Sequence, residues 1–334
     1  MEQIALVCLS FVLAATAVWL LVRRPKGAPR VQVPPEAKPP EREFSPRLPE
    51  GEEEALDRGA GATGLTSLDL DIDVDIDREE PTSPIALILV TAHGSTDVGL
   101  RRSHNEDSIL VFNDELFAIA DGMGGYAAGE VASELCTEVM TAAFETRHFG
   151  GVKDESLPWR GDELVRTIKC ANGVIYAKAQ EDQSKAGMGT TVVAARFSPN
   201  KKQVYLGHVG DSRCYRLRDG TLEQLTTDHT LASLGLTGKN AEKLIRALGV
   251  QPEVDVDLHV EECFGEDLYM LCSDGLSKMV PDDTTAQILA EGAPLDVMVD
   301  RLIAEANANG GRDNVSVVLV RVQDAADFAA ASAP

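Results

Sequence analysis

The stretch Phe117-Ala-Ile-Ala-Asp-Gly-Met-Gly-Gly125 joins an apolar run to a glycine-rich turn, with Asp121 at the junction. The apolar run predicts a buried strand. A carboxylate at the end of such a strand is held rigidly, and Gly122 lets its carbonyl approach an ion closely. Oxygen donors of this kind suit hard cations such as Mg²⁺ and Mn²⁺. Taken alone, one Asp-Gly pair is better explained as an ordinary turn.

Two further aspartates repeat this layout. Asp274 follows the apolar run 268–272, and Asp313 lies in a glycine-lined turn before the apolar run 315–322. Three strand-associated acids, each in a turn with glycine, favour a shared metal centre over three unrelated turns. Two such ions side by side can generate hydroxide from water and attack a phosphate.

The bulk composition excludes several classes of function. The 334 residues, 44% of them apolar, are enough for one large domain with additions. The chain carries 31 Lys and Arg against 54 Asp and Glu, a net charge of -23, which argues against binding to nucleic acid. Its six cysteines form no C-x-x-C pair and no Cys-x5-Arg loop, so a zinc site and cysteine-based phosphatase chemistry are excluded.

The first 23 residues predict a membrane anchor. Residues 4–22 are uncharged and nearly all apolar, and as a helix they would span roughly 28 Å, close to the thickness of a bilayer core. Arg23 and Arg24 follow at once, which predicts a single pass through the inner (cytoplasmic) membrane with the remaining chain in the cytoplasm. The alternative is a cleaved signal peptide, but cations before the run and a small-x-small site after it are missing.

Residues 24–84 are rich in Pro, Glu, Gly and Ala, and such a composition predicts a disordered tether. Within it, residues 68–77 alternate Leu, Ile or Val with Asp, so an extended conformation would place all the acids on one face. We expect a solvated acidic linker. The alternative is a conditional strand that pairs with the edge of a sheet in this domain or in a partner.

Residues 85–324 are expected to form the folded domain, and 325–334 a flexible tail. Strand-like runs occupy 85–92, 108–112, 116–120, 190–197, 203–209, 213–217, 221–224, 267–272 and 315–322. Helical patterns occupy 129–146, 162–180 and 295–306. Two long helices lie together between groups of strands, which favours an α+β sandwich with helices outside a pair of sheets.

A set of motifs in a fixed order gives a resemblance to a known family. The motifs are Asp97-x-Gly99, Arg102 with Asn105-Glu106-Asp107, Asp121-Gly-Met-Gly-Gly125, Gly187-Met-Gly-Thr-Thr191, Gly210-Asp-Ser-Arg213, Ser273-Asp-Gly275 and Asp313-Asn314. Over about residues 90–322 the chain resembles the type 2C metal-dependent protein serine/threonine phosphatases in their bacterial form. The resemblance implies a four-layer α-β-β-α sandwich, in which two antiparallel sheets are flanked by helices.

The resemblance also implies a set of metal ligands. Asp121 would bridge two Mn²⁺ or Mg²⁺ ions, Gly122 would offer its carbonyl to one, and Asp274 with Asp313 would complete the other. A third, weaker ion would be held by Asp182 together with Asp274.

Other matched residues would act around the ions. Arg102 corresponds to the phosphate-binding arginine of the family. The planar guanidinium of an arginine suits a phosphoryl group, because it can donate two parallel hydrogen bonds. Glu106 and Asp107 would act mainly through metal-bound waters, and Asp107 is also predicted as a catalytic residue. Asp211 and Asn314 are expected to orient strands or waters near the ions without binding the ions directly.

Two departures from the family pattern affect the expected chemistry. Met123 stands where eukaryotic relatives place a histidine that is often assigned as the general acid. The segment 228–248, which resembles the flap beside the site, looks shorter than usual.

The predicted function is hydrolysis of phosphoserine and phosphothreonine on cytoplasmic proteins. Family analogy adds membrane Ser/Thr kinases as partners. One alternative is a catalytically inactive scaffold that binds phosphoproteins at the membrane, and another makes the acidic linker the functional part.

Overall fold

The computed structural model describes residues 88–124 and 128–324. The predicted anchor at 4–22, the linker with its alternating segment 68–77, and the tail at 325–334 lie outside the described residues. No helix within the described ranges is long and apolar enough to cross a membrane.

The described chain contains strands and helices in the following order. The strands are β1 (Ile88–Asp97), β2 (Asp107–Phe112), β3 (Leu116–Met123), β4 (Gly189–Thr190), β5 (Val192–Phe197), β6 (Gln203–Val209), β7 (Arg213–Arg218), β8 (Thr221–Gln224), β9 (Asp257–Glu262), β10 (Leu268–Cys272) and β11 (Val315–Asp324). The helices are α2 (Ala128–Thr146), α3 (Trp159–Glu181), the short 3-10 helix η2 (Gln183–Lys185), α4 (Asp274–Ser277), α5 (Asp282–Ala290) and α6 (Leu295–Ala308).

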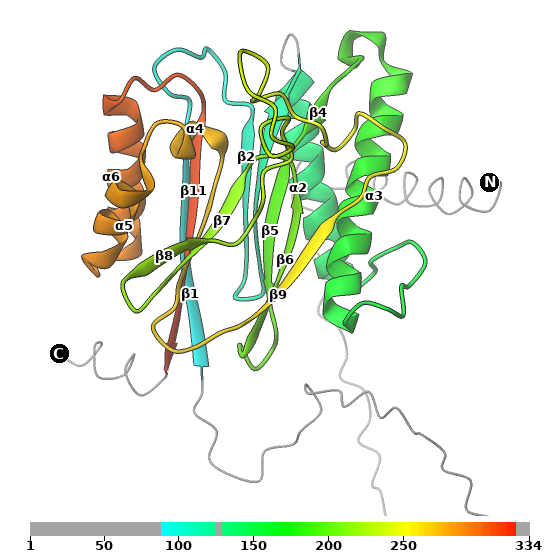
Figure 1. The fold of residues 1–334 in the computed structure, drawn as a ribbon. Coiled ribbons are helices and arrows are strands. Elements are labelled where there is room, and N and C mark those ends of the chain that lie inside the picture. The colour runs from blue at the N-terminus through cyan, green and yellow to red at the C-terminus, as the bar shows by residue number, and fades with distance from the viewer. Residues whose placement is uncertain (1–87, 125–127, 325–334) are drawn as a thin grey trace, which may run out of the picture.

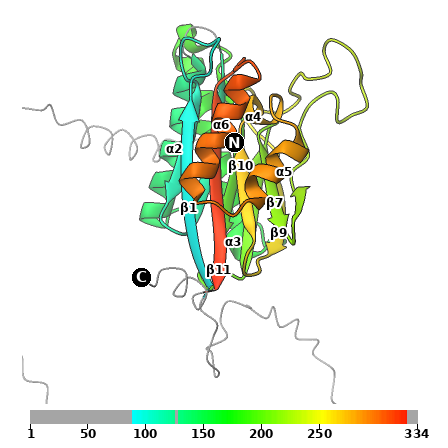
Figure 2. The same ribbon diagram turned by 90° about the vertical axis from the view of Figure 1, so that its left-hand side faces the viewer.

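The strands form two antiparallel sheets that stack face to face. One sheet has the order β1-β11-β10-β7-β8, and the other has the order β2-β3-β5-β6-β9 with β4 paired to β3. Helices α2 and α3 cover one outer face, and α5 and α6 cover the other, as Figures 1 and 2 show. The predicted arrangement of two antiparallel sheets with flanking helices is confirmed.

The alternation of side chains along the central strands explains the layering. In β3, Phe117 and Ile119 pack into the core between the sheets, while Ala118 and Ala120 pack against α2 and α3. Successive residues of a strand point to opposite faces, so a strand covered on both sides reads as a continuous apolar run. The apolar run that ends at Asp121 is therefore a central strand with both faces buried.

Several element boundaries differ from the sequence-based expectation. The first strand begins at Ile88 and continues to Asp97, and α3 begins at Trp159, directly after Pro158. Strand β9 was not predicted, because this exposed edge strand is largely acidic and lacks a buried face. The expected hairpin is present, and Asp219 and Gly220 both have positive φ angles, of 49° and 74°, as a tight two-residue turn requires.

Candidate metal centre

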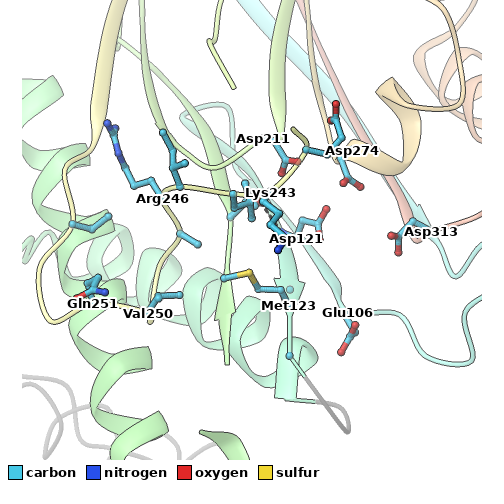
Figure 3. A pocket seen from close by; sticks show the side chains of 18 of the residues that line it. Glu106, Asp121, Met123, Asp211, Lys243, Arg246, Val250, Gln251, Asp274 and Asp313 are labelled. Carbon is cyan, nitrogen blue, oxygen red and sulfur yellow. Dashed lines mark hydrogen bonds between the residues drawn. The ribbon is translucent and has the colours of Figure 1, made fainter. Parts of the chain in front are cut away.

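The predicted acids meet at one end of the stacked sheets. Asp121 lies near the end of strand β3, and Asp274 begins α4, separated from β10 by Ser273. Asp313 precedes β11, and Asp211 follows β6. All four line one cavity of about 860 Å³, where Figure 3 shows them as neighbours. Segments far apart in the sequence thus bring their carboxylates to one place.

The backbone at Asp121 is fixed by its neighbours in the sheet. Its N–H donates to Thr191 Oγ1 at 3.2 Å. Its carbonyl accepts from Thr191 N at 2.8 Å and from Thr190 Oγ1 at 2.9 Å. The Thr191 hydroxyl also contacts Ser212 Oγ at 2.7 Å. The carboxylate is therefore held on a rigid strand end, as the apolar run predicted.

Gly122 lies where no side chain fits. A Cβ atom at this position would be 2.2 Å from the carbonyl oxygen of Gly129 and 2.5 Å from that of Glu106. The Gly122 N–H donates to the same Glu106 carbonyl at 3.0 Å. The start of α2, strand β3 and the loop before β2 therefore pack backbone to backbone beside the acids.

The carboxylates repel one another in a partly dehydrated space. Burial, followed by the charges of Asp107 and Asp274, raises the pKa of Asp121 well above its ordinary value. Burial raises the pKa of Asp107 to about 7 and that of Asp211 to about 6. A group of acids that resists losing its protons in this way is stabilised by a bound cation. The electrostatics of the cavity therefore fit a divalent metal.

The geometry indicates how such an ion would be held. Among the described residues, no three His, Cys, Asp or Glu side chains gather tightly enough to hold an ion alone. The acids converge on one cavity but not on one point. An ion bound here would take few protein oxygens and complete its shell with water, as Mg²⁺ and Mn²⁺ commonly do.

Buried polar contacts hold the loops that carry these acids. The Asp107 carboxylate accepts a hydrogen bond from Ser316 Oγ at 2.6 Å. Asn314 accepts from the Glu106 N–H at 2.8 Å, and its amide donates to the carbonyls of Val98 and His104 at 3.0 and 2.9 Å. Asn314 thus links the segments around residues 98, 104 and 106 by hydrogen bonds beside the acids.

Arg102 stands at the rim of the same cavity. Its side chain is 47% exposed, and its guanidinium contacts Asp313 Oδ2 at 2.8 Å and Glu106 Oε2 at 3.7 Å. A half-exposed guanidinium beside the acids can turn toward a phosphoryl group in the cavity.

Comparison with known proteins decides the family. The family model described as protein phosphatase 2C matches residues 101–315. The chain belongs to the protein phosphatase 2C family.

Individual members of the family share much of the chain. The serine/threonine phosphatase stp of Listeria welshimeri is 40% identical over 240 residues, which cover 67% of this chain and 93% of that protein. PstP of Mycobacterium tuberculosis is 39% identical over 259 residues, which cover 72% of this chain and 46% of PstP. The predicted enzyme class, a protein serine/threonine phosphatase, is confirmed.

Solved structures show the same fold. A crystal structure of the Mycobacterium tuberculosis phosphatase PstP/Ppp gives a TM-score of 0.62 at 36% identity, over 70% of this chain and 99% of that one. A structure of the PstP catalytic domain in complex with two manganese ions gives the same score and identity, over 71% of this chain and 100% of that one.

One predicted ligand of this phosphatase 2C domain is not among the residues that line the cavity. Asp182 caps η2, where its carboxylate accepts from Ser184 N at 3.0 Å and from Ser184 Oγ at 2.6 Å. It lies 3.6 Å from Lys185 Nζ and is absent from the described cavity lining. Asp182 is thus engaged at η2 and is not among the residues that line the cavity, whereas Asp211, which was not expected to bind an ion directly, lies on the cavity wall.

Sequence reasoning placed the flap beside the site but did not single out Lys243 or Lys278, which line the cavity. The flap, which includes 242–247, forms one wall with Lys243 and Arg246, and Figure 3 shows Arg246 on the side opposite Asp313. Lys278 also lines the cavity and is ion-paired with Asp274 and Asp211. Its spacing of four residues from Asp274 was the available signal, because residues i and i+4 of a helical turn are neighbours.

Proposed function

We propose that this chain hydrolyses phosphoserine and phosphothreonine in proteins, using water activated by two Mn²⁺ or Mg²⁺ ions. The observation that carries the proposal is the cavity that gathers Asp121, Asp274 and Asp313 at the ends of strands from both sheets. Family membership supports the reaction, and the two manganese ions of the PstP catalytic domain support the choice of ions.

The residues of the centre have distinct parts in the proposal. Asp121 would stand between the two ions, Gly122 would add its carbonyl to one, and Asp274 and Asp313 would hold the other. Glu106 and Asp107 would hold metal-bound waters. When bound, the ions supply an acidified water and neutralise charge on the phosphate.

The protein's own side chains position the substrate. Arg102 would present its N–H donors to the phosphoryl oxygens from the rim of the cavity. Met123 lines the cavity and has no proton to give, so this position offers no side-chain acid to the leaving group. The flap wall, with Lys243 and Arg246, would contact the peptide around the phosphorylated residue.

The proposed location follows from the sequence alone. Residues 4–22 would anchor the chain in the inner membrane, and residues 24–84 would tether the phosphatase domain in the cytoplasm. Phosphoproteins made by membrane Ser/Thr kinases would then lie within reach of the tether.

The test is hydrolysis of a phosphothreonine peptide by the full chain. Activity should require Mn²⁺ or Mg²⁺, stop in excess EDTA, and be lost in Asp274→Asn. A catalytically inactive scaffold would bind the phosphopeptide without releasing phosphate. Full activity in EDTA would disprove the metal-dependent reaction.

A further inference from the structure

Lys278 occupies a distinctive place beside the acids of the cavity. It directly follows α4, and its N–H donates to the carbonyl of Asp274 at 2.9 Å. Its side chain turns back so that Nζ donates to Asp274 Oδ2 and lies 3.4 Å from Asp211 Oδ2. One ammonium group thus contacts two carboxylates, one at the start of α4 and the other in the link between β6 and β7.

The surroundings keep this ammonium charged. Burial acts to lower the pKa of Lys278, but the charges and hydrogen bonds of Asp274 and Asp211 outweigh it and hold the pKa above its ordinary value. Asp211 is only 7% exposed at its side chain, and Asp274 is 17% exposed. Among the described residues, Lys278 is the one Lys or Arg ion-paired with either acid.

The two ends of the acid cluster are therefore neutralised by different cations. Arg102 pairs with Asp313, and Lys278 pairs with Asp274 and Asp211. A guanidinium fork suits phosphate, whereas a lysine ammonium is a compact point charge. Like a small cation, it binds carboxylate oxygens, in this case through its N–H donors. Lys278 therefore holds the same Asp274 carboxylate that a divalent ion would need.

We propose that Lys278 is an internal competitor for the divalent ion at Asp274 and sets the metal concentration at which the centre fills. The inference rests on the proposed function, because it takes Asp274 as an ion ligand. An ion that binds Asp274 must displace the ammonium from this carboxylate, and it then remains close to a like charge. Repulsion between a dication and an ammonium a few ångströms apart remains strong at the screening typical of protein sites.

Lys278 would serve the metal-free protein in the opposite sense. Without an ion, it is the cation that offsets the buried Asp211 and its neighbour Asp274. Removing the ammonium should therefore destabilise the metal-free chain and raise its affinity for the metal. A purely structural role would move both properties in the same direction, because a damaged site is less stable and binds less well.

The experiment titrates Mn²⁺ into the metal-free full chain by calorimetry at pH 7.5 and records thermal unfolding with and without the ion. In Lys278→Met, the dissociation constant of the weaker binding step should fall at least about tenfold. The Tm of the metal-free protein should fall by about 3 °C or more, and saturating Mn²⁺ should restore it. Lys278→Arg keeps the charge and should stay close to the unsubstituted protein in both measurements.

Lys243→Met is the matched control. It removes the same charge from the flap wall of the same cavity, where Lys243 makes no ion pair with a described acid. Its effect on the binding constant should stay below about threefold, because an exposed charge without a carboxylate partner interacts weakly. If Lys278→Met fails to fold, Lys278→Gln carries the same test.

The outcomes separate the two proposals. If the unsubstituted chain binds no Mn²⁺, the proposed function fails. If it binds two ions but Lys278→Met binds them with unchanged or weaker affinity, the competitor role alone is overturned. An equal gain in affinity in Lys243→Met would also overturn it, since the effect would then belong to general charge and not to this ion pair.

Discussion

Asp107 lies directly opposite Asp121 across the β2–β3 pair. Both carboxylates lie at the sheet end. Burial and the charge of Asp107 raise the pKa of Asp121, and burial with the charges of Asp274 and Asp313 raises the pKa of Asp107. In the metal-free protein this pair is a source of repulsion built into two rigid strands. Binding of a cation relieves the repulsion, so stability and metal affinity are coupled at this site.

Asp121→Asn should separate stability from activity. Removing one charge from the acidic cluster should stabilise the metal-free protein by about 1 kcal/mol or more. Hydrolysis of p-nitrophenyl phosphate with Mn²⁺ should fall on the order of a thousandfold, because the proposed bridging ligand is lost. Thermal unfolding without metal and initial rates with Mn²⁺ measure the two effects. The control is Asp219→Asn in the exposed hairpin turn, which should change neither the stability nor the rate. The prediction would be contradicted if Asp121→Asn made the metal-free protein less stable.

Asp107 and Asp211 should make the metal-free protein less stable as pH rises from about 4 to about 7. In this range the folded state keeps protons on Asp107 and Asp211, whose pKa values are raised to about 7 and about 6 from 3.8. The unfolded chain has already released these protons, so each increase in pH favours unfolding. Urea unfolding across this range, without and with saturating Mn²⁺, tests the point. The decrease should disappear with the ion bound, and a decrease of the same size in both series would refute the assignment.

His208→Phe should remove a separate dependence on pH. His208 is buried, and its Nε2 has no hydrogen-bond partner among the described residues. Burial, followed by the nearby charge of His229, lowers the pKa of His208 to about 4 from 6.5. The unfolded chain therefore takes up a proton between these values and the folded state does not, so this residue costs stability as pH falls from 6.5 toward 4.

The Phe variant keeps a ring beside that of His229, with the two centroids 4.6 Å apart and the planes tilted by 39°, and it removes the unpaired nitrogen. We expect a gain of about 1 kcal/mol at neutral pH that grows as pH falls. Paired urea unfolding curves of variant and parent give the difference at each pH. A difference that stays constant from pH 7 to 4.5 would rule out the assigned protonation.

Arg102→Ala should lower kcat/KM for a phosphothreonine peptide by about a hundredfold, since a charge-assisted pair of contacts to phosphate is lost. Arg102→Lys should recover only part of this loss, because a point charge cannot replace the planar fork. Steady-state kinetics at saturating Mn²⁺ measure both. Arg101→Ala removes a neighbouring exposed arginine as the control, and equal losses in the two alanine variants would show that only surface charge matters.

Much of the fold could be predicted because the central strands have two buried faces. The runs that end at Asp121 and begin after Asp313 are apolar at nearly every position, and few other structures accommodate such segments. Strand β9 escaped prediction because its side chains are mostly exposed and half of them are acidic, so no apolar pattern marks it.

The same contrast holds at the metal centre. The Asp-Gly pairs at residues 121 and 274 are local signals. Their repetition at strand ends and the family resemblance together predicted that these acids meet at one site. The place of Lys278 depends on how α4 directs a side chain back over Asp274, which sequence alone does not show. Asp182 shows the converse, because its position five residues before Gly187 suggested a ligand, while the folded chain uses its carboxylate to cap η2.

The cavity takes Asp121 from a strand of one sheet, Asp274 and Asp313 from beside strands of the other, and Asp211 from the link between β6 and β7. Neither half of the sandwich carries a complete set, so a partly denatured chain that retains a single sheet has no means of turning over substrate. Enzymatic rate during denaturation should consequently track the docking of the two halves, and it can serve as a probe of when they separate.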